Sequence, residues 1–122
     1  MTDIKCIDSS VWLSYYEGQS HQAKEIIDHE SLLLTPSLCL FEVTKKLLKS
    51  GRNPEELIRF IHTRSKIISI NAHIAQKAAT ISIQNKLGAA DALIYTVAQI
   101  HRAELISADN DFRGLPNTII LP

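Results

Sequence analysis

Four acidic residues of this chain are the ones that a solvated surface explains least well. Asp8 ends the apolar run IKCI, and Glu42 interrupts the run LCLFEV. Asp91 is the only charged residue between positions 87 and 100, and Asp109 lies in the segment ISADNDF. A buried carboxylate without a partner is costly, or it is neutralised through a shift of its pKa. We therefore expect these carboxylates to share a partner.

Each acid also has an ordinary structural explanation. Asp8 could simply end a strand, and Asp91 could cap the N-terminus of a helix. Asp109 could form an Asx-turn with the residues that follow it. Glu42 could pair with a lysine on the next turn of its own helix. These explanations need four separate arrangements with compatible geometry, whereas one bound cation accounts for all four acids.

An acidic cluster without histidine or thiolate ligands favours a hard divalent cation. Mg²⁺ prefers carboxylate oxygens and retained waters, and Mn²⁺ suits the same ligands. One or two such ions would supply a more acidic water and stabilise charge on phosphorus. The four acids therefore indicate hydrolysis of a phosphate ester.

The elements that must position these acids alternate between strands and helices. Short apolar runs predict five strands, at 4–7, 32–34, 67–70, 104–107 and 118–121. Helices are expected between them, at 11–18, 20–30, 37–49, 54–64, 71–87 and 89–100, with Asn71 opening the fifth and Gly88 closing it. This alternation implies an α/β fold, in which helices cover both faces of a parallel sheet in three layers. Asp8 and Asp109 follow strands, so they reach the edge where such sheets bind ligands.

Length and composition limit the other possibilities. The 122 residues suit a single domain over 1–122. Thirteen basic and thirteen acidic residues cancel, so an anionic ligand would need a bound cation or a local basic patch. The two cysteines, Cys6 and Cys39, stand in apolar segments typical of reduced core residues. No apolar run approaches the roughly 20 residues of a membrane span, and we expect a soluble, cytoplasmic protein.

In order and spacing, the segments around the acids resemble the PIN-domain family, and within it the compact toxins of VapBC-type toxin–antitoxin pairs. The resemblance spans nearly the whole chain and rests on IDSSVWL, LCLFEVTKKLL, AADALIYTVA and LISADNDF. It implies a sheet of strand order 3-2-1-4-5 and a metal-dependent endoribonuclease. Such an enzyme hydrolyses RNA phosphodiester bonds with metal-activated water. The resemblance also implies a VapB-type antitoxin partner and a homodimer.

The resemblance assigns roles to particular positions of this chain. Metal binding and catalysis fall to Asp8, Glu42, Asp91 and Asp109. Possible accessory members are Ser9, Ser107 and Asp111. Candidate contacts to the RNA phosphates are the nearest basic residues in sequence, which a solvated surface also explains: Lys45, Lys46 and Arg113.

Three other functions share parts of this pattern. A receiver-type signalling domain has the same size and alternation, but it needs an aspartate after its third strand and a lysine near its fifth, and both are missing here. A haloacid-dehalogenase-like phosphatase needs a DxD arrangement, whereas Asp8 is followed by Ser9 and Ser10. The alternative that keeps all four acids is a non-catalytic PIN-like module, which binds RNA or protein without cleaving RNA.

Overall fold

A sheet of five parallel strands runs through the centre of the computed structural model, which describes residues 3–122. Met1 and Thr2, at the start of the predicted domain 1–122, lie outside the described residues. The strands are β1 (Ile4–Ile7), β2 (Leu32–Pro36), β3 (Lys66–Ile68), β4 (Glu104–Ser107) and β5 (Thr118–Ile120). Their order is β3-β2-β1-β4-β5, and every neighbouring pair is parallel. The predicted α/β class and strand order are confirmed.

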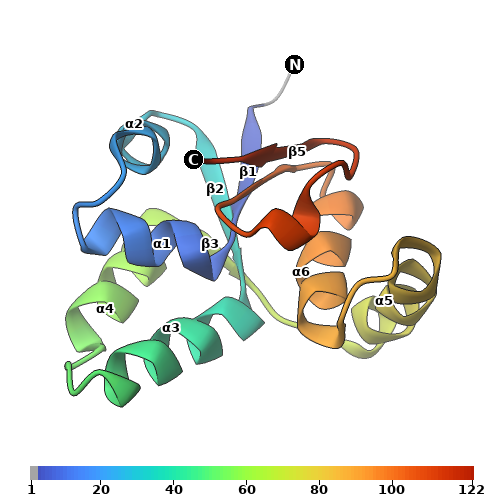
Figure 1. Cartoon of the computed structure of the whole chain (residues 1–122), viewed down its shortest axis with the longest axis horizontal. Coiled ribbons are helices and arrows are strands. Elements are labelled where there is room, and N and C mark those ends of the chain that lie inside the picture. Colours follow the sequence, from blue (N-terminus) through green and yellow to red (C-terminus); the bar gives the residue numbers. More distant parts are fainter. Residues whose placement is uncertain (1–2) are drawn as a thin grey trace.

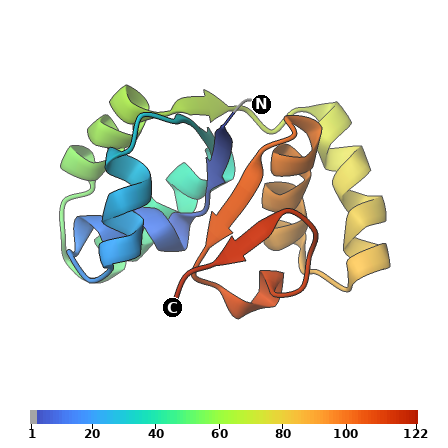
Figure 2. The same cartoon turned by 90° about the horizontal axis from the view of Figure 1, so that it is seen from above.

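Helices cover both faces of this sheet (Figures 1 and 2). On one face lie α1 (Ser9–Tyr16), α2 (His21–Asp28), α3 (Ser37–Lys49) and α4 (Glu55–Arg64). On the other face lie α5 (Ala72–Asn85) and α6 (Ala89–Ile100), together with the short 3₁₀ helix η1 (Asn110–Phe112). The beginnings of α1, α3 and α6 all lie near the carboxyl end of β1 (Figure 1).

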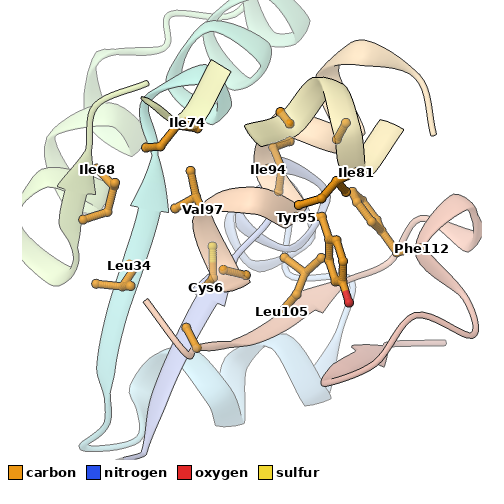
Figure 3. Packing of buried hydrophobic residues seen from close by; sticks show 14 of the residues in the cluster. Cys6, Leu34, Ile68, Ile74, Ile81, Ile94, Tyr95, Val97, Leu105 and Phe112 are labelled. Atoms are coloured by element: carbon orange, nitrogen blue, oxygen red, sulfur yellow. The ribbon is translucent and has the colours of Figure 1, made fainter. Parts of the chain in front are cut away.

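Two hydrophobic cores result from the alternation of side chains along each strand. In β1, Cys6 belongs to the core under α5 and α6, whereas Ile7 belongs to the core under α1 to α4. Leu105 and Ile106 of β4 divide in the same way, because successive strand residues point to opposite faces. Figure 3 shows Cys6 of β1 near Val97 of α6, and Leu105 of β4 near Tyr95 of the same helix. Both sheet faces are therefore buried, as expected for a parallel sheet between helices.

The junction between α5 and α6 differs from the prediction. Asn71 does cap α5, because its side chain accepts the N–H of Ile74 at 2.9 Å. The helix ends at Asn85, and Lys86 adopts the left-handed conformation with φ +55° that glycine was expected to provide. Gly88 instead stands at the N-cap of α6. The prediction that Gly88 closes α5 is wrong, because Lys86 itself ends the helix through a backbone bond to Ser82.

Two further sequence expectations concern cysteines and membranes. Cys6 and Cys39 are fully buried, and both thiols are free. Among residues 3–122, no helix combines the length and the apolar character needed to cross a bilayer.

Candidate metal centre

Five carboxylates from four separate segments meet near the carboxyl ends of the central strands β1 and β4. Asp8 follows β1, and Glu42 lies in the second turn of α3. Carboxylate oxygens of these two residues and the sulfur of Cys39 lie within 4.8 Å of one another. Asp91 begins the other half of the site in the first turn of α6. Its carboxylate lies within the same limit of 4.8 Å of the carboxylates of Asp109 and Asp111.

Asp8 is held in place by two serine hydroxyls. Its side chain is almost completely buried, with 4% exposed. The hydroxyls of Ser10 and Ser107 both donate to Oδ2, at 2.7 and 2.8 Å. The other oxygen, Oδ1, has a longer contact of 3.5 Å with the hydroxyl of Ser9. One carboxylate oxygen of Asp8 is therefore fixed by the protein, and the other is left with little hydrogen bonding.

Glu42 is coupled to the other acids rather than to a lysine. The hydroxyl of Ser9 donates to Oε1 of Glu42 at 2.9 Å. Burial raises the pKa of Glu42, the bond from Ser9 lowers it, and the charges of Asp8 and Asp109 raise it further, with a net increase above 4.5. Within residues 3–122 no ion pair joins Glu42 to a basic side chain. Pairing along its own helix therefore does not explain this acid.

Asp91 experiences the field of the whole cluster. Burial raises its pKa first, and the charges of Asp109, Asp111, Asp8 and Glu42 add to the effect, which brings the pKa to about 6 instead of 3.8. Gly88 occupies the N-cap of α6, so Asp91 is not the capping residue. Its place in the first turn puts the carboxylate near the positive end of the helix dipole, which favours an anion there.

Asp109 shows that a turn-forming role and a place in the cluster are compatible. Its Oδ1 accepts the backbone N–H of Asp111 at 2.9 Å, so the Asx-turn considered for it is present. Its own N–H donates to the Ser107 hydroxyl at 2.9 Å, which links this loop to Asp8. Asp111 is exposed, yet its carboxylate faces those of Asp91 and Asp109. Local turn formation thus places two acids at the site.

The structure brings Ser9 and Ser107, both expected as accessory residues, into contact with Glu42 and Asp8. Sequence reasoning missed the side chain of Ser10, although a hydroxyl two residues after an aspartate at a helix start is a known local pattern. It also missed Cys39, whose three-residue spacing from Glu42 on α3 was a usable signal. Burial and the charge of Asp8 raise the pKa of the Cys39 thiol well above its ordinary value, so the thiol stays neutral. A neutral thiol is a poor ligand for a hard cation.

The three basic candidates lie outside the acid cluster. Lys45 is exposed on α3, with its Nζ 5.7 Å from the centre of the Phe41 ring. Lys46 is exposed in the last turn of the same helix. Arg113 is exposed after η1 and donates to Oδ1 of Asn110 at 2.7 and 3.1 Å. Their role in binding a substrate stays a prediction.

The donor set of the cluster fits a divalent cation. None of the ion pairs in the described part of the chain involves the five clustered carboxylates. Burial, and after it the like charges of the neighbouring acids, raise the pKa of Glu42 and Asp91. A hard cation with oxygen ligands removes this repulsion. Asp8, Glu42, Asp91 and Asp109 are thus suited to hold Mg²⁺ or Mn²⁺, with Asp111 at the rim.

Fold and site together define an α/β protein with an acid-lined centre at the carboxyl edge of a parallel sheet. A sequence model of the PIN domain matches residues 5–117. The chain therefore belongs to the PIN-domain family, and the resemblance seen in its sequence is confirmed. It matches none of the curated proteins with which it was compared.

Solved structures of toxin–antitoxin proteins have the same fold. A chain of a toxin–antitoxin complex from Klebsiella pneumoniae is 26% identical with a TM-score of 0.81, over 94% of this chain and 95% of that chain. VapC20 from Mycobacterium tuberculosis, described as a toxin that cleaves the sarcin–ricin loop, is 15% identical with a TM-score of 0.79, over 97% of this chain and 99% of that chain. VapBC2 from Rickettsia felis, bound to a promoter DNA fragment, is 20% identical with a TM-score of 0.72, over 96% of both chains.

Proposed function

We propose that this chain is a metal-dependent endoribonuclease, a VapC-like toxin that hydrolyses RNA phosphodiester bonds. The observation that carries the proposal is the set of carboxylates from the residue after β1, from α3, from α6 and from the loop after β4. They form two close groups whose charges act on one another, and none has a basic partner among the described residues. Such a cluster binds a hard cation, and a hard cation allows an acidic site to act on an anionic phosphate. Membership of the PIN-domain family supports the same chemistry.

The residues that would hold one or two Mg²⁺ or Mn²⁺ ions are Asp8, Glu42, Asp91 and Asp109, with Asp111 as an accessory member. When bound, such an ion supplies a more acidic water and neutralises charge on the phosphate. Asp8 offers Oδ1, because Oδ2 is already occupied by two serine hydroxyls. Asp91 or Asp109 would orient a water for attack by accepting a hydrogen bond from it.

The substrate we propose is RNA. The net charge of the chain is zero, so attraction to RNA must come from the ion and from local basic residues. Lys45, Lys46 and Arg113 are exposed and not paired with acids within residues 3–122, which leaves them available for phosphates. The description of VapC20 as a toxin that cleaves the sarcin–ricin loop supports this substrate class.

We also propose a protein partner and a setting for this activity. Structures of related folds were determined as toxin–antitoxin complexes, which supports a cognate VapB-type antitoxin for this chain. In this proposal residues 1–122 form one PIN-like domain that acts as a homodimer in the cytoplasm.

The competing function is a non-catalytic PIN-like module. Cleavage of a labelled single-stranded RNA in Mn²⁺, in Mg²⁺ and in EDTA separates the two possibilities. Wild-type protein should cleave only with a divalent ion, whereas Asp8→Asn and Glu42→Gln should lose cleavage and keep the circular dichroism spectrum. Glu25→Gln, which removes an exposed carboxylate of α2, is the matched control and should cleave normally. Equal cleavage by Asp8→Asn and wild type would refute the enzyme assignment.

A further inference from the structure

The hydroxyl of Ser10 joins the first acid of the site to the loop that carries the last two. Ser10 Oγ donates to Oδ2 of Asp8 at 2.7 Å and accepts the backbone N–H of Ala108 at 2.9 Å. Ser107 makes a parallel connection, because it donates to the same Oδ2 at 2.8 Å and accepts the N–H of Asp109 at 2.9 Å. Two consecutive amides of the loop are thus connected to one oxygen of Asp8.

The direction of both connections is determined by the groups at their ends. A backbone N–H can only donate, and an ionised carboxylate can only accept. Each serine has one hydroxyl proton, which must point to Asp8 while a lone pair faces the amide. Both hydroxyl protons are then directed to Asp8, so the oxygens of Ser10 and Ser107, which are 3.4 Å apart, do not share a hydrogen bond. Each connection has a single orientation, so it holds the loop at a defined place relative to Asp8.

Ser10 makes the more exposed of the two connections. Ser107 is fully buried at the end of β4, where the strand is already paired with β1 through residues 104–106. Ala108 lies beyond the end of β4 and is exposed, and its N–H is held by Ser10. The position of Ala108, the first residue of the loop after β4, therefore depends on the Ser10 side chain of α1.

We propose that Ser10 is a positioning residue, which sets the place of the Asp109–Asp111 loop relative to Asp8 so that a divalent ion meets a preformed set of carboxylates. This inference rests on the proposed function, because it assumes that the cluster binds an ion. Residues that orient metal ligands typically change metal affinity or activity by about 10- to 100-fold when they are removed. Because Ser107 provides a second connection, we expect removal of the Ser10 hydroxyl to weaken metal affinity by about 10-fold, the lower limit of this range.

The test compares four variants of the full chain with wild type. Ser10→Ala removes the hydroxyl, and Ser10→Cys keeps a similar volume with a much weaker donor. Ser10→Thr restores a hydroxyl at the same atom. Ser14→Ala is the matched control, because Ser14 is a half-buried serine of the same helix, and no side-chain hydrogen bond of its hydroxyl is found within residues 3–122.

Two quantities are measured, and neither is enzyme activity. Amide hydrogen exchange of residues 108–112 in the metal-free protein measures how firmly the hydrogen bond from Ala108 to Ser10 holds the loop. The electron paramagnetic resonance signal of free Mn²⁺ measures ion affinity. Ser10→Ala and Ser10→Cys should exchange Ala108 at least several times faster and bind Mn²⁺ about 10-fold more weakly. Ser10→Thr and Ser14→Ala should match wild type in both measurements.

The outcomes separate this inference from the proposed function. Wild-type protein without Mn²⁺ affinity would overturn the proposed function and, with it, the role of Ser10 in ion binding. Wild-type protein that binds Mn²⁺, together with Ser10→Ala of equal affinity or unchanged exchange, would overturn the Ser10 inference alone. Loss of affinity in Ser10→Thr or Ser14→Ala would also overturn it, because the effect would then not depend on the Ser10 hydroxyl.

Discussion

Replacement of Asp91 by asparagine should stabilise the metal-free protein at neutral pH. The pKa of Asp91 is about 6 in the folded chain, against an ordinary 3.8. Each pKa unit corresponds to about 1.4 kcal/mol, so the full difference amounts to about 3 kcal/mol. This cost of ionising Asp91 comes first from burial and then from the neighbouring charges. Because Asp91 is only partly buried, solvent reduces much of it, and we expect a gain of about 1 kcal/mol.

The sign of the pH dependence follows from proton linkage. An acid whose pKa is raised on folding binds more protons in the native state than in the unfolded state between the two pKa values. The contribution of Asp91 to the stability of wild type therefore falls as the pH rises from about 4 through about 6, and this loss is complete above that range. The asparagine side chain of the variant does not titrate, so the advantage of Asp91→Asn should grow over this range and reach its full value at pH 7.5.

Urea unfolding in EDTA at pH 4.5 and pH 7.5 measures the difference in free energy of unfolding between Asp91→Asn and wild type. A gain of about 1 kcal/mol at pH 7.5 would raise the melting temperature by roughly 4 °C for a domain of this size. Glu25→Gln serves as control, because it removes an exposed carboxylate of α2 that lies outside the cluster. If Asp91→Asn were no more stable than wild type at pH 7.5, the inferred cost of an ionised Asp91 at this site would be refuted.

The other predictions concern the ion, the thiols and one arginine. Mn²⁺ at 100 times its Kd should stabilise wild type by about 2.7 kcal/mol and thereby raise its melting temperature, but it should leave the melting temperature of Asp8→Asn unchanged. An equal rise in both proteins would contradict binding at the cluster. Iodoacetamide should leave the two buried thiols of the native protein unmodified and should alkylate both in urea, as mass spectrometry would show; alkylation of the folded chain would contradict their burial. Arg64→Ala should lower the free energy of unfolding by about 2 kcal/mol, because the charged guanidinium donates to three carbonyls, that of Ile27 in the last turn of α2 and those of His29 and Ser31 after the helix. Arg64→Lys should recover only part of that loss, and full recovery in urea unfolding would show that the forked geometry is unimportant.

Most of the fold could be predicted because its signals are local. Short segments of three or four residues, rich in apolar side chains, marked all five strands, and helix caps such as Asn71 marked helix starts. The α5–α6 junction was mispredicted because two residues there can each end a helix. Lys86 ends α5 with a positive φ, although glycine adopts this conformation at lower cost. Gly88 instead stands at the N-cap of α6. The pairing order of the strands came from the family resemblance and not from the pattern of residues.

For the site, the sequence by itself determined which acids a solvated surface explains least well, because Asp8 ends an apolar run and Asp91 is the only charged residue within another. Only the tertiary structure decided how the acids are held. The bond from Ser9 to Glu42 spans 33 positions, and the bond from Ser107 to Asp8 spans 99. Such bonds depend on the parallel pairing of β1 with β4 and on the packing of α3 beside α1. Residue type specifies what a carboxylate can bind, whereas the packing of distant segments determines which of its oxygens remains free.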